Sequence, residues 1–203
     1  SGHRDGFVSV EVDPRLARRT KATISQGLHL AEQVNRPNVM IKVPATTDGL
    51  PAITELTALG VSVNVTLIFS LERYTEVLDA YLTGLERRLD QSASIATVNS
   101  VASFFISRVD SLVDSQLSAL PNGSGLAGKT AIHQAKLAYA HFIEVSSSER
   151  WRHLSSHGGR IQRPLWASTS TKNPAYSDTL YVDQLIGPDT VNTLPENTLE
   201  AFS

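Results

Sequence analysis

The sequence predicts an α/β protein in which parallel strands form a barrel surrounded by helices. Strand-like and helical segments alternate about six times, which is typical of a parallel sheet wrapped by helices. Successive strands also carry valines on one face and polar side chains on the other, whereas an open sheet covered on both sides is apolar on both faces. No linker or low-complexity segment divides the chain. We therefore expect a single domain over residues 1–203.

Six segments have the pattern of a strand. The first and third alternate between apolar and polar residues, and the second and fourth are mainly apolar. The last two are short apolar stretches, with a loop or short helix expected between them. The segments cover residues 7–12, 38–43, 61–66, 100–106, 164–168 and 190–194.

Helical patterns follow the strands. Asp13 and Pro14 suit the cap and the first position of a helix, and Ser70 suits the cap of a long amphipathic segment. Gly60 is suited to end the helix before it. The expected helices cover residues 13–34, 47–59, 71–89, 108–120 and 129–147, and a final helix begins near residue 195.

Strand parity gathers polar side chains on one face of the predicted sheet. Alternate residues of a strand point to opposite faces, so the valines of the first three strands share the face beneath the helices. The opposite face collects polar residues near the carboxyl ends of the strands, where active sites of barrel enzymes lie. These residues are Glu11, Lys42, Asn64 and Thr66.

Lys42 is the most informative of these residues, because Ile41 and Val43 flank it in an apolar strand. Burial disfavours the charged form of a lysine unless the ammonium finds a carboxylate or reaches water. A lysine that loses its proton is a nucleophile for carbonyl carbon. Taken alone, Lys42 is better explained by a structural ion pair to Glu11 than by a nucleophile.

Six segments together resemble the transaldolase family, in the style of its longer bacterial and plant-type members. They follow the family's order and spacing and cover nearly the whole chain. The resemblance implies an incomplete (β/α)8 barrel of the class I aldolase type, with about six of eight strand–helix units. The segments are Val-Ser-Val-Glu-Val-Asp-Pro-Arg-Leu (8–16), Met-Ile-Lys-Val-Pro-Ala-Thr (40–46), Gly-Val-Ser-Val-Asn-Val-Thr-Leu-Ile-Phe-Ser (60–70), Ala-Ser-Phe-Phe-Ile-Ser-Arg-Val-Asp (102–110), Arg-Pro-Leu-Trp-Ala-Ser-Thr-Ser-Thr-Lys-Asn-Pro-Ala-Tyr (163–176) and Val-Asn-Thr-Leu-Pro-Glu (191–196).

The resemblance implies a role for each polar residue. Lys42 becomes the Schiff-base lysine, and Glu11 acts with Thr66 to hold the water that shuttles protons. Arg108 becomes the phosphate-binding residue, which agrees with the preference of phosphates for guanidinium groups and helix N-termini. The other implied substrate-binding residues are Asn64, Ser103, Phe105, Ser168 and Lys172, the last at a position where the family more often has arginine.

The implied activity is transfer of a three-carbon dihydroxyacetone unit between sugar phosphates, in the non-oxidative pentose phosphate pathway. The donor is sedoheptulose 7-phosphate or fructose 6-phosphate, and the acceptor is glyceraldehyde 3-phosphate or erythrose 4-phosphate. No metal or organic cofactor is implied. A Schiff-base fructose 6-phosphate aldolase, which cleaves without transferring, is the alternative on the same scaffold.

The chain is shorter than a typical barrel of about 250 residues. The resemblance identifies its first strand as the family's third, so we expect the first two strand–helix units and the C-terminal helical tail to be missing. The family's acid/base aspartate lies on the first strand and has no counterpart here. We therefore expect Schiff-base chemistry with little turnover from these 203 residues alone. Unpaired sheet edges also favour a homo-oligomer.

Other interpretations remain open for single residues. Asn64 and Thr66 also fit polar groups that fill a barrel, and Arg108 fits a surface position at the start of a helix. Phe105 fits the core under every interpretation. Residues 123–130 match the phosphate-loop pattern Gly-x-x-x-x-Gly-Lys-Thr, but the preceding segment has helical spacing where a phosphate loop needs a strand.

Composition excludes several other classes of protein. A formal net charge of -2 gives no electrostatic reason to expect binding to nucleic acid or an anionic membrane. The absence of cysteine excludes disulfides, thiolate nucleophiles and cysteine–zinc sites. No long apolar run and no signal-peptide pattern occur. We expect a cytoplasmic protein.

Overall fold

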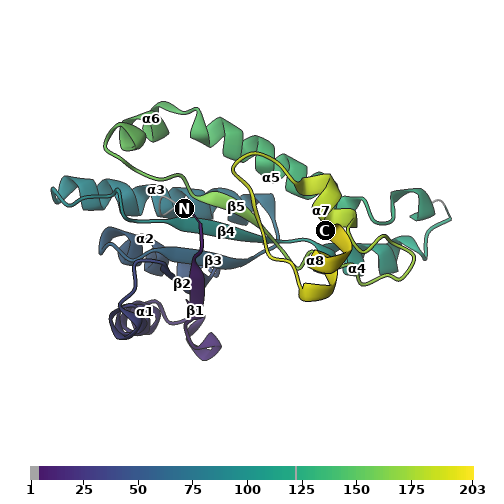
Figure 1. Ribbon diagram of the computed structural model, residues 1–203, viewed down its shortest axis with the longest axis horizontal. Helices are drawn as coiled ribbons and strands as arrows, with labels where there is room; N and C mark the ends of the chain where they lie inside the picture. Colours follow the sequence, from purple (N-terminus) through teal and green to yellow (C-terminus); the bar gives the residue numbers. More distant parts are fainter. Residues whose placement is uncertain (1–4, 122) are drawn as a thin grey trace.

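The structure is a computed structural model that describes residues 5–121 and 123–203. Within these residues, six parallel strands form one sheet in chain order (Figure 1). The predicted fold class is confirmed, because the strands form an incomplete barrel. The strands are β1 (Val8–Glu11), β2 (Val39–Pro44), β3 (Val63–Ile68), β4 (Ser100–Phe105), β5 (Arg163–Ala167) and β6 (Val191–Asn192).

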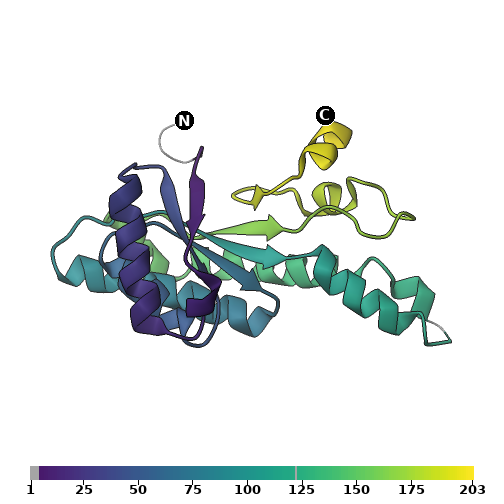
Figure 2. The ribbon, with the colours of Figure 1, turned by 90° about the horizontal axis from the view of Figure 1, so that it is seen from below.

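Helices connect the strands, and the longest of them lie along the same side of the sheet (Figure 2). Ser70 caps α3 as predicted, since its hydroxyl oxygen accepts a 3.2 Å hydrogen bond from the amide nitrogen of Arg73. In the described part of the chain, no helix is both long enough and apolar enough to cross a bilayer. The helices are α1 (Thr20–Val34), α2 (Gly49–Ala58), α3 (Leu71–Asp90), α4 (Ser107–Leu117), α5 (Thr130–Ser146), α6 (Glu149–Ser156), α7 (Leu180–Leu185) and α8 (Glu196–Phe202), with 3-10 turns at Pro14–Leu16 and Gly123–Leu126.

The expectation of one continuous helix over residues 13–34 is wrong. Asp13 caps only the first 3-10 turn, and α1 begins at Thr20. In the break between them, the carbonyl of Ala17 accepts a hydrogen bond from the hydroxyl of Thr46. In a continuous helix, the Ala17 carbonyl would accept a hydrogen bond from a backbone amide one turn later. Its contact with Thr46 therefore favours the break in the helix before Thr20.

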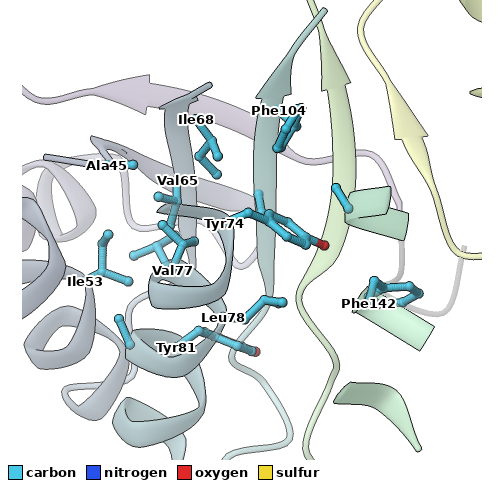
Figure 3. Packing of buried hydrophobic residues seen from close by; sticks show 14 of the residues in the cluster. Ala45, Ile53, Val65, Ile68, Tyr74, Val77, Leu78, Tyr81, Phe104 and Phe142 are labelled. Carbon is cyan, nitrogen blue, oxygen red and sulfur yellow. The ribbon is translucent and has the colours of Figure 1, made fainter. Parts of the chain in front are cut away.

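The main core fills the space between the sheet and the helices. The ring of Phe104 on β4 is fully buried and lies nearly perpendicular to Tyr74 and Trp166, with centroid separations of 5.8 and 6.3 Å. Figure 3 shows Tyr74 and Val77 of α3 beside Val65 of β3. The predicted valine-rich face is thus confirmed as the buried face. Its fully buried aliphatic members on β2 and β3 are Ile41, Val43, Val63, Val65 and Ile68.

Strand β1 departs from this pattern. Val12 is buried, but Val8 on the same face is 62% exposed. Strand β1 is an edge of the described sheet, so its residues have a neighbouring strand on one side only. The prediction that Val8 packs beneath the helices is therefore wrong.

The opposite face of the sheet, called here the inner face, carries a smaller apolar cluster. Met40 and Leu165 belong to it, on strands β2 and β5. The polar residues selected by strand parity share this face. The remaining buried members are Val101, Phe105 and Ala167.

The phosphate-loop pattern lies between two helices. Helix α4 precedes it, and the chain then passes through the turn Gly123–Leu126 into α5; Asn122 lies outside the described residues. The Lys129 ammonium donates a 2.8 Å hydrogen bond to the carbonyl of Gly125 in its own loop. Because a phosphate loop connects a buried strand to a helix, this geometry argues against a nucleotide site.

Candidate active site

Lys42 and Glu11 are direct neighbours at the carboxyl end of β1. The two residues pair in register, so their side chains lie on the same face of the sheet. Lys42 Nζ forms an ion pair with Glu11 Oε1. The Lys42 side chain is 28% exposed and the Glu11 side chain 60%. An ion pair this exposed contributes little to stability. The Lys42 side chain is partly exposed on the inner face.

Asn64 lies next to Lys42, in register on β3. Its side-chain nitrogen donates a 2.9 Å hydrogen bond to the hydroxyl of Ser9, and its oxygen accepts one of 2.7 Å from the hydroxyl of Ser103. These two contacts hold the amide in place between β1 and β4, because each serine hydroxyl can donate or accept a hydrogen bond. The second N–H of the amide remains to donate to a ligand.

The hydrogen bond between Asn64 and Ser9 also reports on the shape of the sheet. Ser9 lies on β1 and Asn64 on β3, with β2 between them. In a flat sheet, two strands so separated are about 9.5 Å apart. A 2.9 Å contact between their side chains therefore indicates that the sheet curves toward the inner face.

Thr66 is buried near the carboxyl end of β3, opposite Pro44. Its hydroxyl has no hydrogen-bond partner among the described residues. The next residue, Leu67, has φ of +63°, and the pairing of β3 with β4 shifts register between Val65 and Ile68. A buried hydroxyl without a protein partner is suited to bind a water molecule or a substrate oxygen.

Phe105 and Arg108 lie where β4 passes into α4. The guanidinium carbon of Arg108 is 4.8 Å from the centroid of the Phe105 ring, within the range of a cation–π contact. The Phe105 ring also lies 5.0 Å from that of Phe69. Arg108 is exposed and is the second residue of α4. The first turn of α4 therefore presents a guanidinium group and the positive end of a helix dipole together.

Ser168 contacts the start of the same helix. Its hydroxyl lies 2.9 Å from that of Ser107, and its carbonyl accepts a 3.0 Å hydrogen bond from the Ser107 amide. Ser168 has φ of +57°, which turns the chain away from β5. Lys172 is exposed, and its ammonium donates to the hydroxyl of Ser170 at 2.8 Å. Lys172 thus contacts a residue of its own loop. Ser168 contacts α4 directly, whereas no described hydrogen bond joins Lys172 to that helix.

Three residues of the site were missed by sequence reasoning. Ser9 shares parity with Glu11, so the strand pattern already placed it on the inner face. Ser107 and Phe69 follow the ends of β4 and β3, and no periodic signal applies beyond the end of a strand. Within the described ranges, no three histidine, aspartate or glutamate side chains gather as metal ligands.

The sequence matches one protein-family model and several curated proteins over nearly its whole length. The family model described as transaldolase/fructose-6-phosphate aldolase matches residues 3–203. The chain is 59% identical over 203 residues to a protein named transaldolase 1 from Streptomyces avermitilis, covering 99% of this chain and 54% of that protein. It is 57% identical over 201 residues to a transaldolase from Saccharopolyspora erythraea, covering 99% of this chain and 55% of that protein. The chain thus spans about half the length of the curated relatives that it matches.

Proposed function

The chain belongs to the transaldolase/fructose-6-phosphate aldolase family, and on that premise we propose that its inner face transfers a dihydroxyacetone unit between sugar phosphates through a Schiff base on Lys42. One observation carries the proposal. The amine of Lys42 is accessible at the carboxyl ends of the strands, beside the carboxylate of Glu11 and in register with Asn64. An amine beside a base can act as a nucleophile toward a ketone.

The first stage joins Lys42 to the donor ketose. The unprotonated amine attacks the carbonyl carbon, the carbonyl oxygen is protonated, and loss of water leaves an iminium ion. Glu11 accepts and returns the protons, because its carboxylate is the acceptor paired to Lys42. The hydroxyl of Thr66, which lacks a partner in the described structure, helps to hold the water that carries them.

In the second stage, the bond between the third and fourth carbons breaks. Its electron pair moves into the iminium and forms an enamine, and the hydroxyl proton on the fourth carbon passes to a base. An aldose phosphate leaves, and the three-carbon enamine stays on Lys42. Attack of the enamine on the aldehyde of a second aldose phosphate reverses these steps and gives the new ketose.

Two residues orient the three-carbon unit. Asn64 has one side-chain N–H left to donate to a hydroxyl of the dihydroxyacetone unit, and Ser103 holds the amide in that orientation. Phe105 is 8% exposed and supplies an apolar wall near the enamine. Limiting water there protects a reactive intermediate from protonation.

The phosphate of the substrate lies against the first turn of α4. Arg108 supplies a guanidinium group there, and Ser168 is held at the same turn through Ser107. Guanidinium groups bind phosphate oxygens in a two-bond geometry, and helix N-termini favour anions. Lys172 adds positive charge from a neighbouring loop.

The proposal extends to the setting of the protein. The substrates are sugar phosphates, and the reaction needs no metal or organic cofactor because the iminium is the electron sink. We place this chemistry in the cytoplasm, in the non-oxidative pentose phosphate pathway. We also propose that residues 1–203 form one truncated barrel domain, and that the exposed edges of its sheet favour a homo-oligomer.

Product analysis with and without an acceptor tests the proposal. The protein at its natural length is incubated with fructose 6-phosphate, alone or with erythrose 4-phosphate. We expect sedoheptulose 7-phosphate with the acceptor and little free dihydroxyacetone without it. Free dihydroxyacetone in equal amounts under both conditions indicates the aldolase, the other activity in the family description. Absence of both products contradicts the proposal.

A further inference from the structure

Two carboxylates on α4 each hold a tyrosine from the segment between β5 and the end of α7. Asp110 accepts hydrogen bonds from the hydroxyl of Tyr181 at 2.9 Å and from the amide of Ala131 at 2.7 Å. Asp114 accepts hydrogen bonds from the hydroxyl of Tyr176 at 2.7 Å and from the amide of Gly128 at 3.0 Å. The two carboxylates are one helical turn apart. We name Asp110, Asp114, Tyr176 and Tyr181 the tyrosine clamp.

The tyrosine clamp fastens one end of a segment whose other end is also fastened to α4. Ser168 contacts Ser107 at the first turn, whereas Tyr176 contacts Asp114 further along the helix. Lys172 lies between these two attachment points in the sequence. The segment that carries Ser168 and Lys172 is thus attached at both ends to the helix that carries Arg108.

Burial and charge make the attachment between Asp110 and Tyr181 strong, whereas Asp114 and Tyr176 are half-buried. The side chains of Asp110 and Tyr181 are each 1% exposed. Burial raises the pKa of Asp110, and the hydrogen bonds from Ala131 and Tyr181 oppose that rise. Burial and the neighbouring Asp110 carboxylate raise the pKa of Tyr181, so its hydroxyl keeps the proton that it donates. Hydrogen bonds to a carboxylate in such a setting are stronger than those between neutral groups.

Gly128 belongs to the same arrangement. Its φ is +71°, and a Cβ atom there would lie 2.9 Å from Cζ of Tyr176. A side chain at this position would therefore displace the tyrosine from Asp114. Gly128, the second glycine of the phosphate-loop pattern, thus makes room for the ring of Tyr176 beside Asp114.

We propose that the tyrosine clamp positions the phosphate-binding groups of the site by holding the segment with Ser168 and Lys172 against the helix with Arg108. This inference rests on the proposed function, because the proposed function places the substrate phosphate at the first turn of α4. The clamp residues act through that segment and are positioning residues. Loss of one tyrosine hydroxyl loosens the segment and weakens binding of the phosphate, and it leaves the amine of Lys42 in place.

Tyr176→Phe in the protein at its natural length tests this, because it removes the hydroxyl and keeps the ring. We expect the Kd of inorganic phosphate, measured by titration calorimetry, to rise about 5- to 20-fold. The KM for fructose 6-phosphate should rise similarly, with kcat within about twofold of the unsubstituted protein. Borohydride trapping of dihydroxyacetone, which carries no phosphate, should be unchanged.

Tyr139→Phe is the matched control. Tyr139 is also half-buried, and its hydroxyl donates a 3.1 Å hydrogen bond to the carbonyl of Pro188, outside the clamp. Loss of the Tyr139 hydroxyl should leave the Kd of phosphate within about twofold of that of the unsubstituted protein. A second pair of variants grades the effect: Asp114→Asn keeps an acceptor oxygen and should weaken phosphate binding less than Asp114→Ala.

The outcomes separate this inference from the proposed function. Trapping on Lys42 with equal phosphate affinity in the Tyr176→Phe and Tyr139→Phe variants overturns the clamp and leaves the proposed function standing. Clamp-dependent phosphate binding without an adduct on Lys42 keeps the clamp and overturns the proposed function. No measurable phosphate binding by the unsubstituted protein overturns the clamp.

Discussion

Ser103 donates a 2.7 Å hydrogen bond to the side-chain oxygen of Asn64, and this bond joins β4 to β3 on the inner face. Both residues are buried, at 2% and 6% exposure, so little water can replace a lost partner. The contact therefore links the stability of the sheet to the orientation of a proposed substrate ligand.

Ser103→Ala should lower both stability and substrate affinity. The oxygen of Asn64 loses its described partner in a buried site, which costs about 1–3 kcal/mol of unfolding free energy. The amide also becomes free to rotate, so the KM for fructose 6-phosphate should rise. Urea denaturation and steady-state kinetics measure the two effects. Ser115→Ala, which removes an exposed hydroxyl from α4, is the control and should change stability by less than about 0.5 kcal/mol.

Glu11→Gln should lower turnover while leaving the nucleophile Lys42 in place. The substitution keeps the shape of the side chain and removes the proton acceptor paired to Lys42. We expect turnover to fall about 10²- to 10⁴-fold, the usual contribution of a general base. Borohydride trapping should still occur on Lys42 but at a lower rate, because Glu11 carries protons in that stage, and the free energy of unfolding should change by about 1 kcal/mol or less. Unchanged turnover would remove Glu11 from the proton path.

Arg108→Lys should weaken recognition of phosphorylated substrates. Lysine keeps the charge but cannot form the two parallel bonds of a guanidinium to a phosphate. We expect the KM for fructose 6-phosphate to rise about tenfold, with little change in trapping of dihydroxyacetone. Arg152→Lys, an exposed substitution on α6, is the control. Equal KM values for the two variants would place the phosphate elsewhere.

Phe104→Ala should destabilise the sheet from its helix-covered face. The ring is fully buried and contacts Tyr74 and Trp166, so its removal leaves a cavity. We expect a loss of about 3–5 kcal/mol in unfolding free energy, measured by urea denaturation. Phe202→Ala, at a position that is 43% exposed, should cost under about 0.5 kcal/mol. Similar costs for both variants would contradict the assigned core.

Strand parity made much of the inner face predictable. Side chains alternate along a strand whatever surrounds it, so Glu11, Lys42 and Asn64 could be assigned to one face from sequence alone. Ser103 was selected only by the family resemblance. Their roles came from the family resemblance and remain predictions. The exposure of Val8 could not be predicted in this way, because burial depends on whether a neighbouring strand is present.

Other features depend on contacts between distant residues. The hydrogen bond between Asp110 and Tyr181 joins residues 71 positions apart, and neither side chain is distinctive within its own segment. The break before α1 likewise involves Thr46, far along the chain from Ala17. Propensity and periodicity describe neighbours in sequence, so they cannot predict hydrogen bonds of this kind.

Covalent trapping on Lys42 tests the central claim most directly. The protein is incubated with fructose 6-phosphate and borohydride, digested, and mapped by mass spectrometry; Lys42→Met, which removes the amine but keeps a side chain of similar length, is treated in parallel. We predict a reduced three-carbon adduct on Lys42 and no adduct in the variant. An adduct on a different lysine, or an equal yield from the Lys42→Met protein, would contradict the account.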